Sequence, residues 1–157
     1  MIEIEVPHRG VMRLRHLVLD VNGTLALDGE LLPGVAERLG RLSRALEVHL
    51  VTADTHGRQD EIDDALGVKA VRLDKERSDA EQKLAYLCRL GADEAVAVGN
   101  GANDVLMLRR ARVGIVVLGP EGVAAAALAS ADVVVRDVKD GLDLLLNPRR
   151  LVATLRR

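Results

Sequence analysis

Aromatic residues are almost absent from this chain of 157 residues, which contains one tyrosine and neither phenylalanine nor tryptophan. Proteins that bind single-stranded nucleic acid stack successive bases on exposed aromatic rings, so the composition argues against that class of partner. The net charge of -2 at pH 7 also gives no basic field that would attract a polyanion. We therefore expect no nucleic-acid partner.

Cysteine and long apolar runs are also scarce. The single cysteine, Cys88, excludes an intramolecular disulfide and a zinc site built from several cysteines, and a reducing cytoplasm fits this usage. The first 15 residues carry charges throughout, unlike a signal peptide. The most apolar stretch, residues 113–135, is interrupted by Gly119, Pro120 and Gly122, whereas a membrane-spanning helix needs about 20 mostly apolar residues in a row. We therefore expect a soluble cytoplasmic protein without a membrane partner.

Short apolar runs that do not alternate with polar residues recur along the chain. The runs are His16–Asp20 and residues 48–52, 68–73, 95–98, 114–118 and 132–135. Uninterrupted valine and leucine are typical of strands buried on both faces of a parallel sheet. Helical patterns separate the runs, including an alanine-rich one over residues 121–130. This alternation predicts an α/β fold with a doubly wound parallel sheet, formed by one domain of residues 1–157.

Smaller signals surround the predicted sheet. Ile2–Val6 predicts an additional strand before it, and the Asp-Gly pair at the centre of residues 27–32 predicts a small hairpin. Ser78 and Glu81 match the capping box that opens a helix, and Gly91 suits the C-terminal end of the same helix.

Polar clusters follow three of the predicted strands, at residues 20–24, 52–54 and 99–104. In open α/β sheets, ligands bind beyond the carboxyl ends of the strands, so we expect the three clusters to meet in one crevice. A carboxylate such as Asp20 can attack phosphorus and form an aspartyl-phosphate. A hard oxygen ligand such as Asp104 suits Mg²⁺. The residue types therefore indicate a phosphate site.

Three sequence motifs carry a family resemblance. They read DVNGTL over residues 20–25, LVTAD around Thr52 and GNGAND over residues 99–104. In this order they resemble the motifs of the haloacid dehalogenase-like (HAD-like) phosphatases, and most closely those of the soluble relatives of the P-type ATPase catalytic domain. The resemblance covers nearly the whole chain. It implies a capless Rossmann-like core with residues 27–32 as a small flap, Mg²⁺ as the cofactor and a small phosphorylated substrate.

The resemblance also implies a role for each motif residue. Asp20 is the implied nucleophile, and Asn22 offers the metal its backbone carbonyl. The implied catalytic residues are Asp20, Asn22, Thr52 and Lys83; the implied phosphate-binding residues are Gly23, Thr52, Lys83 and Asn103; the implied metal ligands are Asp20, Asn22, Asn100 and Asp104. Taken alone, the residues leave alternatives open. Lys83 also fits a snorkelling surface lysine, with Lys75 as its rival, and Asn103 and Asp104 also fit the cap of the following helix.

Two positions depart from the family pattern. Most phosphatases of this type carry an aspartate two residues after the nucleophile as general acid and base, where this chain has Asn22. Some relatives use an acidic residue of the last motif as a direct metal ligand, where this chain has Asn100. We therefore expect a slow phosphohydrolase that cleaves a small phosphomonoester through an aspartyl-phosphate.

Two other functions fit parts of the pattern. The same fold fits a phosphate-binding or regulatory module that has lost turnover. A phospho-receiver domain also has a doubly wound sheet with an acceptor aspartate, but it places the acceptor on a later strand than the one that ends at Asp20. Because a neighbouring subunit often covers the crevice of capless relatives, we also expect a homo-oligomer.

Overall fold

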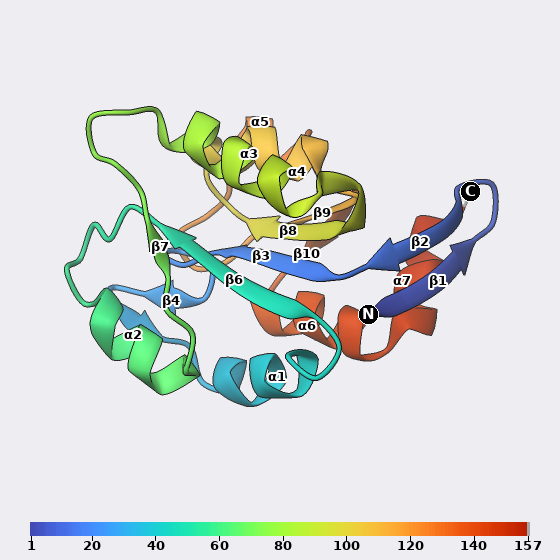
Figure 1. Ribbon diagram of the computed structural model, residues 1–157, viewed down its shortest axis with the longest axis horizontal. Coiled ribbons are helices and arrows are strands. Elements are labelled where there is room, and N and C mark those ends of the chain that lie inside the picture. Colours follow the sequence, from blue (N-terminus) through green and yellow to red (C-terminus); the bar gives the residue numbers. More distant parts are fainter. Residues whose placement is uncertain (157) are drawn as a thin grey trace.

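The computed structural model describes residues 1–156 and confirms the predicted doubly wound sheet (Figure 1). Six parallel strands lie in the order β10-β9-β8-β3-β6-β7. They are β3 His16–Asp20, β6 Glu47–Thr52, β7 Val71–Arg72, β8 Ala95–Gly99, β9 Val113–Val117 and β10 Val133–Val135. Strands β3, β8 and β9 are buried at nearly every position, which explains why their sequences do not alternate with polar residues.

Helices cover both faces of this sheet, in two layers that Figure 1 separates. They are α1 Val35–Leu42, α2 Gln59–Leu66, α3 Asp79–Leu90, α4 Val105–Arg110, α5 Ala125–Leu128, α6 Val138–Leu146 and α7 Pro148–Leu155. Helices α1, α2 and α6 share a core with Leu17 and Leu19 of β3, whereas α3, α4 and α5 share the other core with Val18. Consecutive strand residues point to opposite faces, so β3 contributes to both cores. No helix within residues 1–156 is long and apolar enough to cross a membrane.

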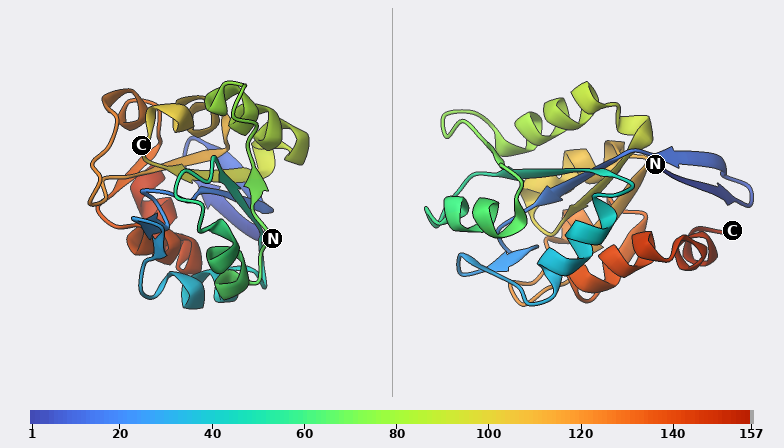
Figure 2. Two further views of the ribbon diagram at one scale, coloured as in Figure 1. Left: turned by 90° about the vertical axis from the view of Figure 1, so that its left-hand side faces the viewer. Right: turned by 60° about the horizontal axis from the view of Figure 1, so that its bottom comes forward.

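A hairpin and a helix form one end of the molecule (Figure 2, right). The predicted strand β1 (Ile2–Val6) is confirmed, and it pairs antiparallel with β2 (Gly10–Leu14), which we had not predicted. Helix α7 packs against β1. This end lies at the amino side of β3, far from the strand ends that carry the polar clusters.

The predicted flap lies at the opposite end of the molecule (Figures 1 and 2). It consists of β4 (Ala26–Leu27) and β5 (Glu30–Leu31), paired antiparallel. Asp28 and Gly29 at its tip have φ angles of 51° and 80°. Two consecutive residues with positive φ are what a type I′ hairpin turn requires, so the Asp-Gly pair sets the shape of the flap.

Two predicted elements are shorter than expected. The run over residues 68–73 forms a strand only at Val71–Arg72, because this edge strand pairs with no more than the last two residues of β6. The helix expected over residues 121–130 is confined to Ala125–Leu128. Gly122 precedes it with a φ of 81°, and a left-handed residue cannot be part of a right-handed helix.

Helix α3 begins and ends as predicted. The side chain of Ser78 accepts a hydrogen bond from the backbone N–H of Glu81 at 3.4 Å. Gly91 follows the last turn with a φ of 106°, a conformation that costs glycine little. These two limits fix the register of the helix and place Lys83 in its second turn, on the side that faces the sheet.

Candidate active site

The carboxyl ends of three adjacent strands bring the predicted clusters together. Asp20 is the last residue of β3, Thr52 is the last residue of β6, and Asn100 follows β8. Strand β3 lies between β6 and β8 and pairs directly with both. Parallel strands end at the same edge of a sheet, so the three side chains lie at one edge.

Lys83 links the residues at the ends of β3 and β8. Its Nζ donates to Oδ1 of Asp20 at 2.6 Å and to Oδ1 of Asp104 at 2.7 Å. Only 1% of the Lys83 side chain is exposed, and the two carboxylates are buried as well. The rival Lys75 is exposed in the loop before α3. The structure therefore brings Lys83, and not Lys75, to the motif residues.

The charges of this cluster do not balance, since one ammonium group faces two carboxylates. Burial, assisted by the charge of Asp104, raises the pKa of Asp20 from 3.8 to about 7 although Lys83 opposes the shift. Burial alone would lower the pKa of Lys83, but Asp20 and Asp104 together raise it. A divalent cation would offset the excess negative charge, so the donor set fits a hard metal ion such as Mg²⁺.

Asp104 also holds the loop that follows β8. Its Oδ2 accepts hydrogen bonds from the backbone N–H groups of Asn100 and Gly101, both at 2.9 Å. These donors immediately precede the short 3-10 helix Ala102–Asp104. The Asp104 side chain makes no capping hydrogen bond to the following helix α4; it caps the 3-10 helix instead, and this role is compatible with a place in the site. The Asn103 side chain is half-buried beside Gly101 and, within residues 1–156, makes no hydrogen bond to Asp20 or Lys83.

Thr24 links the first and last motifs and was not among the predicted site residues. Its Oγ1 lies 3.1 Å from Oδ2 of Asp20 and 3.3 Å from Oδ1 of Asn100. The side chain is almost fully buried. The hydroxyl has one proton, so it donates to one of these oxygens at a time. Its position inside the DVNGTL motif was the signal that could have identified it.

Asn22 is held by the loop that follows β6. Its Nδ2 donates to Oγ1 of Thr52 at 3.4 Å and to Oγ1 of Thr55 at 3.2 Å. The Thr52 hydroxyl also accepts the backbone N–H of Asp54 at 2.9 Å. The amide thus lies next to the hydroxyl that the family resemblance assigns to phosphate. Thr55 is a further contact that the sequence analysis missed.

Gly23 is closely surrounded. Its φ is 79°, and a Cβ at this position would lie 2.8 Å from Nδ2 of Asn100 and would collide with the carboxylate of Glu121. Glu121 belongs to the loop after β9, which is tied to the last motif because Nδ2 of Asn100 donates to the carbonyl of Gly122 at 3.4 Å. The loop after β9 therefore brings a third carboxylate to the site, and no motif predicted it.

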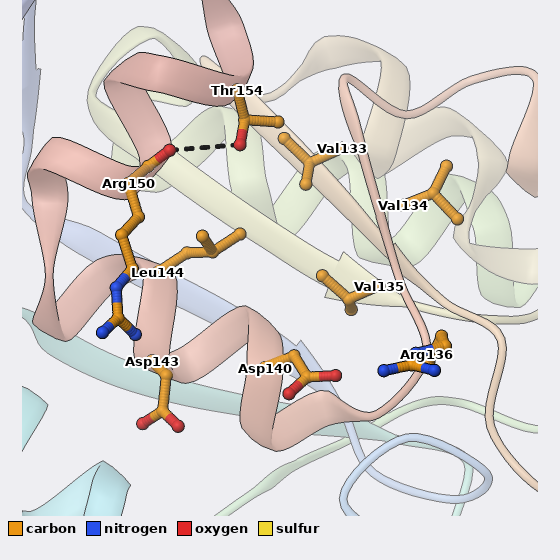
Figure 3. Close-up of a pocket in the computed structure, with 9 residues that line it drawn as sticks. All are labelled: Val133, Val134, Val135, Arg136, Asp140, Asp143, Leu144, Arg150 and Thr154. Atoms are coloured by element: carbon orange, nitrogen blue, oxygen red, sulfur yellow. Dashed lines mark hydrogen bonds between the residues drawn. The ribbon is translucent and has the colours of Figure 1, made fainter.

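One hollow adjoins the motif residues, and a second lies away from them. One of about 180 Å³ adjoins the site and is lined by Thr24, Leu32, Pro120 and Asp137, among others. A wider hollow of about 400 Å³ lies beside the edge strand β10 and the helices α6 and α7 (Figure 3). Arg136, Asp140 and Arg150 line that second hollow, and none of the motif residues does. The first hollow is therefore the space available next to the crevice.

Comparisons with known proteins agree with this geometry. A family model for haloacid dehalogenase-like hydrolases matches residues 6–112, more than half of the chain. An uncharacterized protein of Methanocaldococcus jannaschii is 42% identical over 92 residues, which cover 55% of this chain and 99% of that protein.

Solved structures that share the fold include two phosphatases. The 3-deoxy-D-manno-octulosonate 8-phosphate phosphatase of Moraxella catarrhalis, in complex with a magnesium ion, a phosphate ion and a KDO molecule, is 18% identical. That match covers 85% of this chain and 86% of the other, with a TM-score of 0.66. The cobalt-bound deoxy-D-mannose-octulosonate 8-phosphate phosphatase of Haemophilus influenzae is 14% identical, over 86% of this chain and 88% of the other, with a TM-score of 0.68. At such identities the likeness shows the fold alone.

Proposed function

The chain belongs to the haloacid dehalogenase-like hydrolases, and we propose that it is a magnesium-dependent phosphohydrolase that cleaves a small phosphomonoester through an aspartyl-phosphate on Asp20. The contact of buried Lys83 with both Asp20 and Asp104 carries this proposal. It combines a strand-end carboxylate with a fixed positive charge. These are the two groups that attack on phosphorus requires.

The reaction has two displacements at phosphorus. In the first, an oxygen of Asp20 bonds to phosphorus while the bond to the leaving oxygen breaks. In the second, water bonds to phosphorus, the bond to Asp20 breaks, and phosphate is released. Lys83 and the hydroxyl of Thr52 would hold the phosphoryl oxygens, and fixed donors of this kind stabilise the charge of the transition state. The backbone at Gly23 and the side chain of Asn103 would complete the phosphate-binding set.

The chain offers four groups for the metal: the carboxylates of Asp20 and Asp104, the backbone carbonyl of Asn22 and the side-chain oxygen of Asn100. When bound, Mg²⁺ neutralises charge on the transferring group. Both oxygens of Asp104 already accept hydrogen bonds. Each carboxylate oxygen has two lone pairs, so Oδ1 can contact Lys83 and the ion together.

Turnover is proposed to be slow because the site lacks a proton carrier at Asn22. The amide donates to Thr52 and Thr55, but it can neither protonate the leaving oxygen nor accept a proton from water. General acid and base catalysis contributes typically about 10²–10⁴-fold. Substrates with good leaving groups, such as aryl phosphates, should therefore react faster than alkyl phosphates.

The test is Mg²⁺-dependent hydrolysis of an aryl phosphate by the purified protein. We expect activity in the wild type and none in Asp20→Asn, because the amide cannot attack phosphorus. Asp64→Asn is the matched control, since Asp64 is an exposed aspartate of α2 and its loss should leave activity unchanged. Equal activity in Asp20→Asn and the wild type would remove Asp20 as the nucleophile.

A catalytically weakened phosphate-binding or regulatory module is the second candidate function. The amides at Asn22 and Asn100 favour it, since each stands where many relatives have a carboxylate. Under this alternative, phosphate and Mg²⁺ bind together in calorimetry, but no screened phosphomonoester is hydrolysed. The two functions are thus separated by one binding measurement and one assay.

We also propose that the protein forms a homo-oligomer in which the flap covers the crevice of a neighbour. Asp28 at the flap tip is exposed and could contact a second copy, whereas the exposed Glu30 already pairs with Arg58 at 3.4 Å. Light scattering after size exclusion tests this proposal, and a monomer at all concentrations would contradict it.

A further inference from the structure

The amino end of the sheet holds a second cluster of metal-ligating side chains. His16 opens β3, Glu47 opens β6, and His49 follows two residues later. Asp20 closes β3 four residues after His16, and a strand rises about 3.3 Å per residue, so the two clusters are about 13 Å apart. The proposed hydrolase site does not use any of the three residues. We propose that His16, Glu47 and His49 bind a divalent transition-metal ion, with Zn²⁺ as the best match.

The strand register brings the three side chains to one face. His16 and Glu47 are directly opposite each other in the parallel pair of β3 and β6. Glu47 and His49 are two residues apart on β6, so their side chains leave the same face of the sheet. The face is the one covered by α3, because Tyr86 of α3 contacts His49. The cluster therefore follows from backbone pairing and does not depend on a flexible loop.

The three ligand atoms converge on one point. Nδ1 of His16 lies 3.2 Å from Nε2 of His49 and 3.2 Å from Oε2 of Glu47. The distance between Nε2 of His49 and Oε2 of Glu47 is 3.8 Å. These separations are close to the roughly 3.3 Å between the ligand atoms of a tetrahedral Zn²⁺ with bonds of about 2.0 Å. Small rotations of the side chains, without movement of the backbone, would therefore allow the three atoms to bind one ion.

Hydrogen bonding links only two of the three ligand atoms. Nδ1 of His16 and Nε2 of His49 lie at hydrogen-bond distance, 3.2 Å, whereas the contact of Glu47 with His16 is an ion contact that requires a protonated ring. With a metal ion present, all three atoms would use lone pairs at once. Two histidines and one carboxylate leave a fourth position for water, as in sites of the His₂Glu type.

The contact with Tyr86 can orient His49 as a metal ligand. The hydroxyl of Tyr86 lies 3.0 Å from Nδ1 of His49. If Nδ1 donates to this oxygen, the lone pair of Nε2 faces the cluster, an arrangement that is common for metal-binding histidines. Burial, together with the charge of His16, lowers the pKa of His49, which favours the neutral ring that a metal requires.

The site has an entry path. The histidine side chains are 14% and 16% exposed, whereas Glu47 is 72% exposed. A hollow of about 360 Å³ is lined by two of the ligands, His16 and Glu47, together with Met1, Arg15 and Arg44, among others. The two rings are thus held in place, and the exposed glutamate can close over an ion that enters from solvent.

Calorimetry with ZnCl₂ tests this proposal, with millimolar Mg²⁺ present to occupy the other site. We expect one Zn²⁺ per chain in the wild type. His49→Gln should weaken binding by at least a hundredfold and Glu47→Gln by at least tenfold, whereas Tyr86→Phe should weaken it by about 10–100-fold through loss of the hydroxyl. His56→Gln is the matched control, since His56 is an exposed histidine in the loop after β6, and it should bind Zn²⁺ like the wild type.

Co²⁺ provides a second measurement that does not depend on activity. Wild type with Co²⁺ should show the strong visible absorption of a four-coordinate ion, and His49→Gln should not. Circular dichroism establishes that each variant is folded; Glu47→Gln changes an exposed side chain and keeps the test valid if a histidine variant unfolds. Stoichiometric Zn²⁺ binding that is unchanged in folded Glu47→Gln and His49→Gln would overturn the proposal. So would the absence of stoichiometric binding by the wild type at micromolar Zn²⁺.

Discussion

Nζ of Lys83 lies 2.6 Å from Oδ1 of Asp20, although 63 residues separate the two in the chain. The same ammonium group lies 2.7 Å from Asp104. Both carboxylates and the lysine are buried, so each charge depends on the others for its solvation. The ion pairs of this trio therefore link the stability of the fold to the chemistry proposed for it.

Lys83→Met should destabilise the protein strongly. The variant keeps the volume of the side chain but leaves two buried carboxylates without their cation. Removal of one partner from a buried ion pair costs about 3–5 kcal/mol, and we expect a loss of unfolding free energy in this range in chemical denaturation without metal at pH 8. Lys75→Met is the control, because Lys75 is exposed and such surface changes usually stay within about 0.5 kcal/mol. Equal stability of the two variants would contradict the ion-pair argument.

Asp20→Asn should change how stability depends on pH. Burial raises the pKa of Asp20 to about 7, against 3.8 for the ordinary carboxyl. Between these values the folded chain holds a proton that the unfolded chain has released, so this group makes stability fall as pH rises from about 4 to 7. The amide has no such proton. The stability of the metal-free variant relative to the wild type should therefore rise as pH increases through this window, and the difference should be largest above it, at pH 8.

Chemical denaturation of both proteins at pH 5, 6, 7 and 8 measures this difference. Asp64→Asn controls for the loss of one exposed carboxylate, and its difference from the wild type should stay nearly constant with pH. If the difference between Asp20→Asn and the wild type is also constant, burial does not raise the pKa of Asp20.

Much of the site could be predicted because its geometry follows from sheet topology. Asp20 and Thr52 end adjacent parallel strands, and Asn100 follows a third, so short apolar runs were sufficient to place them together. The choice between Lys83 and Lys75 was not settled by the sequence. It depends on the register of α3 against the sheet, and a long side chain on the border of an apolar face can point either way.

The missed residues have a different cause. Glu121 reaches Gly23 only because the loop after β9 turns at Gly122, whose φ is 81°. The same turn shortens the alanine-rich helix that we had predicted there. A helical pattern over residues 121–130 carries no information about a left-handed glycine within it, so the local prediction failed and the contact with the first motif could not be foreseen.

Gly23→Ala should reduce activity more than it reduces stability. The added Cβ meets the Glu121 carboxylate and the Asn100 amide, so one of them must move within the site. Displacements of about 1 Å can cost about 10²-fold in rate, and we expect at least a tenfold loss of kcat/KM in the aryl phosphate assay. Gly67→Ala is the matched control, with a φ of 63° and nothing within 4 Å of the added Cβ. It carries the same backbone strain, about 1–2 kcal/mol, without the collision. Wild-type kcat/KM in Gly23→Ala would show that the contact does not shape the site.

Asn22→Asp should accelerate turnover. The Asn22 amide donates to the hydroxyls of Thr52 and Thr55. The hydroxyl of Thr55 can rotate and donate to a carboxylate instead, while Thr52 keeps its proton for the phosphoryl group, so the substitution retains the contact with Thr55 and adds a group that carries protons. We expect kcat to rise at least about tenfold, which corresponds to about 1.4 kcal/mol of barrier. The gain should be larger for alkyl than for aryl phosphates, because poor leaving groups depend most on an acid.

Asn22→Ala separates the causes, since it removes the amide contacts without supplying an acid and should not accelerate the reaction. Mg²⁺ affinity is measured in parallel by calorimetry. An unchanged or lower rate in Asn22→Asp, with the metal still bound, would mean that the site is not a hydrolase that lacks its acid. The amide would then serve to keep phosphate bound, as the binding-module alternative requires.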